Sequence, residues 1–386
     1  EMGGTKDAVR PPALPWTVRV QLAAFSLAHR PDGSLRRRYC SLADLRVAAK
    51  PRPDSSGVRS ADVTVDASRG LWARVFSPSS SAAEAPAPLP VVVFFHGGGF
   101  ALFSAASRPY DALCRRLCSG LGAVVVSVNY RLAPEHRFPA AYDDGMDVLR
   151  YLDTNGLPAD LAVPVDLSSC FLAGDSAGGN IAHHVAQRWT AAMSTTPSSL
   201  RLAGVVLIQP FFGGEERTEA EVALDKVALT LSMAATDVYW REFLPEGATR
   251  DHPAARVCGE HVDFAEAFPS AMVVVGGHDL LKDWQARYVE ARASGRVPRR
   301  LPRLPRVPGA PRLRQARGRH EAVRRRASTV HNCREQHSDV NTLGESIRDV
   351  ICRYWCVNNC DGQAKLFSPL NKNSPIQNVT LHLLFK

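Results

Sequence analysis

Membrane spans, a secretion signal and paired cysteines are missing from this 386-residue chain. No apolar run reaches the length of a membrane span, and residues 1–6 lack the basic-then-apolar pattern of a signal peptide. The nine cysteines show no paired spacing in the main part of the chain. We therefore expect reduced, mostly buried thiols and a cytoplasmic protein, with a nuclear location as the alternative and no binding to membranes. The thiols concerned are Cys40, Cys114, Cys118, Cys170 and Cys258.

The net charge of +9 comes from one segment of the chain. Residues 291–328 contain thirteen arginines and one acidic residue, Glu321, so this segment carries +12 and the rest of the chain −3. The basic balance is therefore no argument that the folded part binds nucleic acid. A hydrophobic content of 45% and a charged content of 22% are ordinary for a globular protein. The length fits one large α/β domain with added segments, or two small domains.

Short apolar runs alternate with helical patterns along the centre of the chain. Residues 110–121 and 142–152 have helical patterns, whereas 63–65 and 71–76 alternate like edge strands. This order predicts a mostly parallel sheet with helices on both faces. The runs that suit buried strands are Val91–Phe95, Ala123–Val128, Cys170–Ala173, Val205–Ile208 and Ala271–Val275.

A Gly-x-Ser-x-Gly pattern occupies residues Gly174–Gly178. A strand-like run ends at Ala173 and a helix-like stretch begins near Asn180, which is the context of a nucleophile elbow. The turn is tight, so the two glycines leave room for a strained backbone that lifts the Ser176 hydroxyl clear of the sheet. Alone the pattern is weak, because Gly and Ser also build ordinary loops. It predicts Ser176 as a nucleophile only in combination with a second motif.

That second motif is His96–Phe100, which follows the strand-like run 91–95. Backbone without side chains can direct N–H groups at a developing oxyanion. We expect the hole to use the N–H groups of Gly97 and Gly98, completed by that of Ala177. The alternatives are a glycine-rich turn and a phosphate loop, and no Gly-Lys-Ser/Thr ending supports the latter.

With both motifs in this order, the chain resembles the plant carboxylesterases of the hormone-sensitive-lipase-like group of α/β-hydrolases. The likeness runs from about Pro15 to Ala291. Gibberellin receptors are close relatives in that group, so a non-catalytic binding protein is a second hypothesis. Further matching stretches are Asn129–His136, Phe138–Ala141, Gly174–Asn180, and Gly276–Leu280 with Asp283 and Trp284.

The resemblance implies an α/β-hydrolase fold with a helical cap and neither cofactor nor metal. Residues 1–50, which look helical over 14–48, form an N-terminal cap segment. Residues 51–291 form the core, and an insert at about 213–261 supplies the second cap piece over the substrate pocket. Residues 292–386 form an aberrant tail that we expect to be irregular and disordered.

The resemblance assigns a catalytic acid but leaves the base unassigned. Asp279 follows the last strand-like run, where the matching residue of the family holds the catalytic histidine; the alternative is a helix N-cap. Asp175 is interpreted as a loop carboxylate bound to backbone. The family's His-Gly-Phe element after one more strand is missing. The other histidines are interpreted as surface or packing residues, with His96 in the oxyanion loop: His96, His136, His183, His184, His278, His320, His331 and His337.

A change of reading frame near residues 291–295 explains the tail. Shifted by one base, codons chosen for Leu313–Ser328 encode a sequence like the family's last helix, and those chosen for Leu301–Gly309 encode a His-Gly-Phe. The tail would then lack the final strand. Cys352, Cys356 and Cys360, and the glycosylation sequon at Asn378, would be read-through. The alternative is that the arginines form a nucleic-acid or membrane patch.

These observations predict a serine carboxylesterase of small acyl esters that is impaired because its histidine is missing. The alternative is a gibberellin-receptor-like binding protein. Receptors of the family typically carry Ser where this chain has Gly99, which favours the enzyme.

Overall fold

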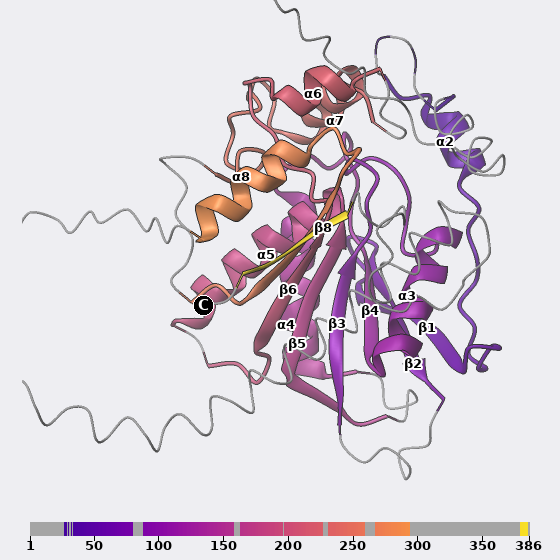
Figure 1. Cartoon of the computed structure of the whole chain (residues 1–386). Coiled ribbons are helices and arrows are strands. Elements are labelled where there is room, and N and C mark those ends of the chain that lie inside the picture. Colours follow the sequence, from indigo (N-terminus) through magenta and orange to yellow (C-terminus); the bar gives the residue numbers. More distant parts are fainter. Residues whose placement is uncertain are drawn as a thin grey trace, which may run out of the picture.

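Eight strands of the described residues form a single sheet. The computed structural model describes residues 27–28, 30, 32, 34–79, 88–157, 163–195, 197–226, 231–258, 267–293 and 379–384. The strands are β1 (Val58–Asp66), β2 (Leu71–Pro78), β3 (Leu89–Phe95), β4 (Val124–Asn129), β5 (Val165–Asp175), β6 (Leu202–Ile208), β7 (Ala271–Gly276) and β8 (Val379–Leu384). Their order across the sheet is β1-β2-β4-β3-β5-β6-β7-β8 (Figure 1).

The centre of the sheet is parallel and its edges are antiparallel. Strands β4, β3, β5, β6 and β7 pair in parallel, whereas β2 runs antiparallel to both β1 and β4. The prediction of a mostly parallel sheet is thus confirmed. The prediction that 71–76 is an edge strand is wrong, because β2 lies between β1 and β4. An alternating pattern reflects burial on one side, as in β1. In β2 residues 73–77 are all buried, so the alternation there does not mark an edge.

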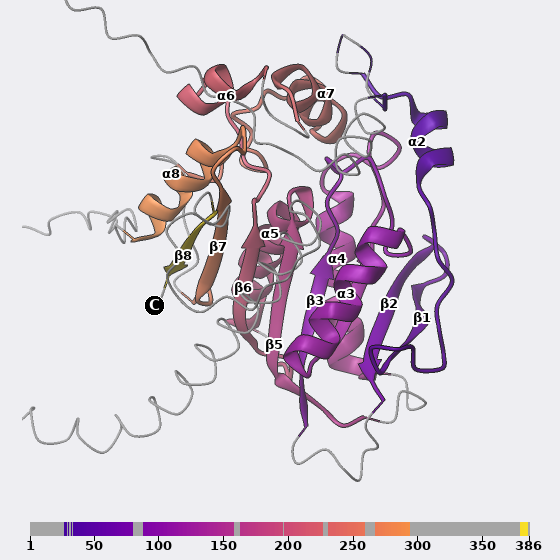
Figure 2. The same ribbon diagram turned by 45° about the vertical axis from the view of Figure 1, so that its right-hand side comes forward.

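Helices cover both faces of the sheet, as the alternation predicts. The helices are α2 (Arg37–Ala43), α3 (Arg108–Leu121), α4 (Ala140–Asn155), α5 (Ala177–Met193), α6 (Glu219–Leu224), α7 (Met233–Phe243) and α8 (Lys282–Ala293). Helix α3 lies on one face, and α4 and α5 lie on the other (Figure 2). Strand β3 shows the consequence: Val91 and Val93 pack in the core with α4 and α5, and Val92 packs in the core with α3. An interior strand buried on both faces reads as one apolar run.

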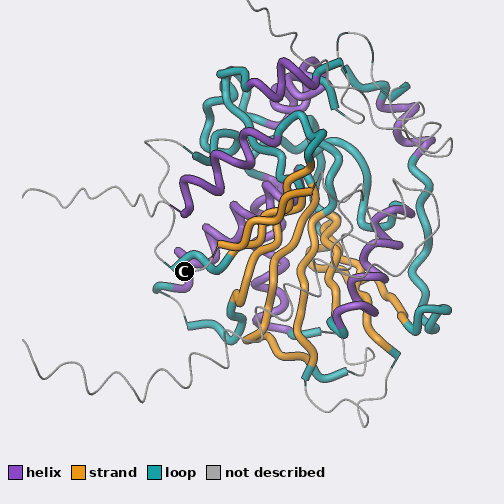
Figure 3. The backbone as a smooth tube through the Cα atoms, in the orientation of Figure 1, coloured by secondary structure: helices purple, strands orange, loops and turns teal. Residues whose placement is uncertain are grey.

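The insert between β6 and β7 folds as the helices α6 and α7 at one end of the sheet (Figure 3). Helix α6 begins with a capping box, in which the Thr218 side chain accepts from the Glu221 N–H and the Glu221 carboxylate accepts from the Thr218 N–H. The predicted helical insert at 213–261 is therefore present over 219–243. From the predicted N-terminal helical segment, α2 is the helix within the described residues.

Strand β8 comes from the segment that the sequence predicts to lack the last strand. It pairs antiparallel with β7 from Val379–Gly276 to Leu384–Ala271, so a strand does cover that edge of the sheet. Its sequence VTLHLL alternates apolar and polar residues, as a strand requires. Residues 294–378, with the arginine-rich segment and Cys352, Cys356 and Cys360, lie outside the described residues.

The five cysteines of the main part are free thiols, and four of them are buried, as predicted. Among the helices that the structure describes, none combines the length and apolarity needed to cross a bilayer.

Candidate active site

Ser176 stands at the sharp turn between β5 and α5. Its φ of 54° and ψ of −115° lie in a region that side chains rarely adopt. Three backbone hydrogen bonds hold this turn. The Ser176 N–H donates to the Ile208 carbonyl at 2.9 Å, and the Ser176 carbonyl accepts from Phe211 at 2.9 Å and from Asn180 at 3.1 Å. The end of β6, the loop after it and the first turn of α5 thus fix the backbone that presents the hydroxyl.

The two glycines of the elbow are required by close backbone contacts. A Cβ on Gly174 would lie 2.1 Å from the Gly178 carbonyl oxygen, and a Cβ on Gly178 would lie 2.0 Å from the Phe95 carbonyl oxygen. Neither neighbour can give way, because both are main-chain atoms. The elbow therefore packs directly against the end of β3, from which the second motif begins.

The oxyanion loop, His96–Phe100, departs in one respect from the prediction. The Gly97 N–H donates to the Tyr110 hydroxyl at 2.9 Å, so it already has an acceptor in this structure. Within the described ranges, no acceptor is bound by the N–H groups of Gly98, Gly99 and Ala177. Ala177 is the first residue of α5, where an N–H has no partner inside the helix. These three groups are therefore the free donors beside Ser176.

His96 fixes the loop and does not act as a base. Its buried ring stacks on Tyr130 with centroids 4.3 Å apart, and its Nδ1 lies 2.8 Å from the Gly97 carbonyl oxygen. The Tyr130 hydroxyl donates to the His96 carbonyl at 2.7 Å. Burial lowers the pKa of His96 to about 4, so the ring is neutral at pH 7 and its Nδ1–H donates to Gly97.

The prediction that the backbone binds the Asp175 carboxylate is wrong, because the phenol of Tyr110 binds it. The Tyr110 hydroxyl donates to Asp175 Oδ2 at 2.9 Å. Burial and, less strongly, the charge of Asp279 raise the pKa of Asp175 to about 6, against the lowering effect of the Tyr110 hydrogen bond. The residue before the nucleophile is thus a carboxyl that titrates near neutral pH.

Asp279 lies just beyond β7, as predicted, and its carboxylate is held by amides. Its Oδ1 accepts from the Leu281 N–H at 2.9 Å, and its Oδ2 accepts from Gln285 at 2.7 Å and Gln209 at 3.3 Å. The bond to Leu281 lies at the start of α8, so the helix-capping alternative is present in part. Burial raises the pKa of Asp279 despite these hydrogen bonds.

No imidazole of the described residues bonds to the Ser176 hydroxyl or to the Asp279 carboxylate. His183 is buried and lies 3.2 Å from the Tyr288 hydroxyl, His184 Nε2 lies 3.2 Å from the Ala254 carbonyl, and His136 is exposed. These three have the packing or surface role that the sequence predicts. His320, His331 and His337 lie outside the described residues.

Strained backbone gathers at this site. Four residues other than glycine have a positive φ in the described part of the chain: Phe100, Phe103, Ser176 and Gln209. They follow the carboxyl ends of β3, β5 and β6, which are neighbours in the sheet. Such residues cost about 1–3 kcal/mol each and cluster at functional sites. The carboxyl edge of a parallel sheet is also where α/β proteins bind ligands.

Helix α7 forms an aromatic roof over the oxyanion loop. The Phe100 ring stacks on Phe243 at 3.7 Å between centroids, and the Trp240 ring stacks on Phe211 at 4.6 Å. A Cβ on Gly99 would lie 2.3 Å from the Tyr239 ring. The cap insert therefore contacts the loop itself and makes its surroundings apolar.

Helix α8 connects helix α6 of the insert to the candidate acid Asp279. Asp283 accepts from the Ala220 N–H at 2.8 Å, and the Trp284 indole donates to the buried Glu221 carboxylate at 3.1 Å. The next residue, Gln285, binds Asp279. Three consecutive residues of one helix thus hold both the first turn of α6 and the candidate acid.

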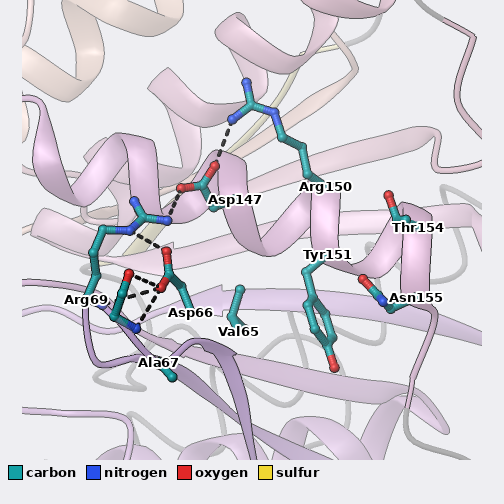
Figure 4. A pocket seen from close by; sticks show the side chains of 10 residues that line it. Val65, Asp66, Ala67, Arg69, Asp147, Arg150, Tyr151, Thr154 and Asn155 are labelled. Carbon is teal, nitrogen blue, oxygen red and sulfur yellow. Dashed lines mark hydrogen bonds and ion pairs between the residues drawn. The ribbon is translucent and has the colours of Figure 1, made fainter.

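A shallow hollow of about 570 Å³ lies between the end of β1 and α4 (Figure 4). Its charged residues are paired with one another: Arg69 contacts Asp66 and Asp147, both at 2.6 Å, and Arg150 contacts Asp147 at 2.8 Å. No residue of the elbow or the oxyanion loop lines it. The hollow is therefore not the candidate site. Among the described residues, no cluster of three or more His, Cys, Asp or Glu could hold a metal ion.

Residues 92–308 match the α/β-hydrolase fold family. The chain belongs to this family. A gibberellin receptor of Arabidopsis thaliana is 44% identical over 282 residues, which cover 69% of this chain and 78% of the receptor. A probable carboxylesterase of the same plant is 41% identical over 233 residues, which cover 60% of this chain and 68% of that protein. An esterase from the archaeon Pyrobaculum calidifontis superposes with a TM-score of 0.57 at 27% identity, over 73% of this chain and 85% of the esterase. This α/β-hydrolase thus resembles both receptors and esterases, as the motifs predict.

Three supporting residues of the site escaped the sequence reasoning: Tyr110, Gln209 and Gln285. Tyr110 lies in an amphipathic helical pattern, and Gln285 lies in a helix without a distinct apolar stripe, so neither carries a local signal. Gln209 directly follows a buried strand at the same edge as Ser176 and Asp279. That position was the signal that could have found it.

Proposed function

We propose that this α/β-hydrolase is a carboxylic-ester hydrolase of small, mostly apolar acyl esters with Ser176 as the nucleophile. The observation that carries the proposal is the strained backbone of Ser176, held between β5 and α5 beside a loop with free N–H groups. A non-glycine residue keeps such a conformation only where its surroundings impose it. A presented serine hydroxyl beside preorganised donors is the arrangement that acyl transfer uses.

In this proposal the oxyanion hole consists of the N–H groups of Gly98, Gly99 and Ala177. Attack of Ser176 Oγ on the ester carbonyl would place negative charge on the carbonyl oxygen, which these donors stabilise. Gly97 supports the loop through Tyr110 and takes no direct part. The aromatic roof from α7 would contact the acyl group and keep water out.

Turnover also requires a base. Serine attack needs a group that takes the hydroxyl proton, and the part of the chain that the structure describes offers none to Ser176. We therefore infer that Asp279 serves to orient a histidine, that the altered frame after about residue 291 has removed it, and that this chain is an impaired esterase. The raised pKa of Asp279 fits an acid that a histidine would normally contact.

A fluorophosphonate probe tests the assignment. The chain as it stands should label slowly, and a variant with the frame restored beyond residue 291 should label quickly, at Ser176 in both cases. Ser176→Ala should abolish labelling and turnover of p-nitrophenyl acetate in the restored variant. Fast labelling of a different residue, or full turnover by Ser176→Ala, would refute the nucleophile assignment.

A second candidate is a gibberellin-receptor-like binding protein. It is favoured by the 44% identity to a receptor and by the Asp279 carboxylate, whose described partners are two amides and a backbone N–H. Against it stands Gly99, where the receptors typically carry Ser and where a side chain would collide with Tyr239. Gibberellin binding by calorimetry, measured beside p-nitrophenyl acetate turnover on one preparation, separates the two. Tight binding without turnover by the frame-restored variant would favour the receptor.

We also propose a cytoplasmic location, which the five free thiols support. Imaging a fluorescent fusion in plant cells tests this proposal, and accumulation in the secretory pathway would contradict it.

A further inference from the structure

The elbow and the oxyanion loop belong to two different strands, and a side chain from a third element bridges them. Tyr110 lies on α3, the helix that follows the loop. Its hydroxyl accepts from the Gly97 N–H at 2.9 Å and donates to Asp175 Oδ2 at 2.9 Å. Asp175 immediately precedes Ser176. Two hydrogen bonds through one oxygen therefore connect the loop to the nucleophile.

We propose that Tyr110 is a positioning residue that holds the oxyanion loop in register with Ser176 and acts through the Asp175 carboxylate. The inference rests on the proposed esterase function. A phenol has one proton, so a carboxylate that only accepts fixes the direction of both bonds: Gly97 donates to Tyr110, and Tyr110 donates to Asp175. A bond to a charged acceptor is stronger than a neutral one. The bridge sets the Gly97 peptide, and the next two peptides carry the free N–H groups.

Packing fixes the phenol before any substrate arrives. Its ring lies 5.5 Å from the His96 ring and 5.6 Å from the Phe103 ring, both centroid to centroid. The side chain is buried. A Cβ on Gly97 would lie 2.8 Å from the Tyr110 oxygen and 2.8 Å from Asp175 Oδ2. Gly97 is thus the residue that allows the three groups to meet, which gives the first glycine of the loop a role other than oxyanion binding.

The groups that face Asp175 oppose its ionisation, except for Tyr110. Asp279 after β7 opposes it and Tyr110 on α3 favours it, and Tyr130 lies close enough that the charge of Asp175 raises the pKa of that phenol. Burial and Asp279 raise the pKa of Asp175, whereas the Tyr110 hydrogen bond lowers it. Removing the hydroxyl should therefore weaken the bridge and also move the ionisation of Asp175 to higher pH.

The test compares Tyr110→Phe with Tyr288→Phe in the full-length, frame-restored protein. Tyr288 is a matched control, because it is also a buried tyrosine and its hydroxyl lies near His183 on the other face of the sheet. We expect Tyr110→Phe to lower the maximal rate of Ser176 phosphonylation about tenfold or more, since small misplacements in a site cost up to about a hundredfold. The apparent affinity for the probe should stay within twofold, and the control should match the wild type. Equal rates for the two variants would overturn the proposal.

A readout that does not need a reactive serine accompanies the labelling. Amide hydrogen exchange of residues 96–103 should become about tenfold faster at Gly97 in Tyr110→Phe and stay unchanged in Tyr288→Phe, because one hydrogen bond protects that amide. Unchanged exchange would refute the bridge whatever the labelling shows. If the wild type is not labelled at Ser176, the proposed function fails while exchange still decides the bridge.

A double-mutant cycle with Asp175→Asn shows whether Tyr110 acts through the carboxylate. We expect the effects of Tyr110→Phe and Asp175→Asn on Gly97 exchange to be smaller together than their separate effects combined. Full additivity would mean that Tyr110 acts independently of Asp175 and would overturn that part of the proposal. Circular dichroism of each variant checks that the fold is intact.

Discussion

Replacing Ser176 by glycine should make the protein more stable while removing the proposed nucleophile. The residue sits at φ 54° and ψ −115°, where a Cβ is strained and glycine is not. Ser176→Ala is the control, because it also removes the hydroxyl but keeps the Cβ and hence the strain. The comparison of glycine with alanine therefore isolates the backbone.

The magnitude follows from two opposing contributions. A non-glycine residue in such a conformation costs about 1–3 kcal/mol. Glycine loses more chain entropy on folding, at a cost of about 0.5–1 kcal/mol relative to alanine. The difference leaves Ser176→Gly about 1 kcal/mol more stable than Ser176→Ala. For a domain of roughly 250 residues this corresponds to about 2–4 °C in Tm.

Urea unfolding followed by circular dichroism, and calorimetric melting, measure this difference. Gly247 has a positive φ of 80° with no atom within 4 Å of a Cβ placed there, so Gly247→Ala reports the same strain in the opposite direction at a remote turn. Ser176→Gly equal to or less stable than Ser176→Ala would refute the reasoning. It would mean that the elbow is relaxed and that the inference of function from strain fails.

Three further predictions concern packing and charge. Glu221→Ala should destabilise the protein by about 3 kcal/mol, because it removes the buried carboxylate of an ionic contact with Arg217. The control Glu216→Ala removes an exposed ion pair and should leave the urea midpoint nearly unchanged. Equal effects of the two variants would contradict the burial argument. Gly178→Ala should lower the free energy of unfolding in urea by at least about 2 kcal/mol, since its Cβ would lie 2.0 Å from the Phe95 oxygen. A neutral result would mean that β3 and β5 separate freely at this point. Burial raises the pKa of Asp175 from its ordinary value of 3.8 to about 6 in the folded state. The folded state therefore binds this proton more tightly, and the stability that the carboxyl contributes falls as pH rises from about 4 to 6. The same pH profile of stability for the wild type and Asp175→Asn would refute this prediction.

The parallel core and the elbow were predictable because their signals are local. Strand β3 and its neighbours are buried on both faces, so their positions show as uninterrupted apolar runs. The close contact that requires Gly174 lies within the pentapeptide, with the Gly178 carbonyl, whereas Gly178 is required by Phe95 at the end of β3. Periodicity and turn chemistry depend on residues a few positions apart, so they can be recognised in the sequence alone.

The connections between distant segments were not predictable in the same way. Tyr110 and Asp175 are 65 positions apart and meet only once α3 packs against the sheet. The hydrogen bond of the Gly97 N–H was not foreseen for this reason, since its partner Tyr110 lies on another element. Strands β7 and β8 pair although about a hundred residues separate them in the sequence, and no local pattern near β7 indicates such a partner.

Helix α8 contacts both the candidate acid and the insert between β6 and β7. Gln285 binds the Asp279 carboxylate, and Asp283 with Trp284 binds the first turn of α6 in the insert between β6 and β7. A shift of this helix along its axis would therefore move the candidate acid and the insert together. Substitutions that alter the apolar surroundings of the loop and leave the partners of Asp279 in place should be sought on α7, whose Tyr239, Trp240 and Phe243 lie against the loop.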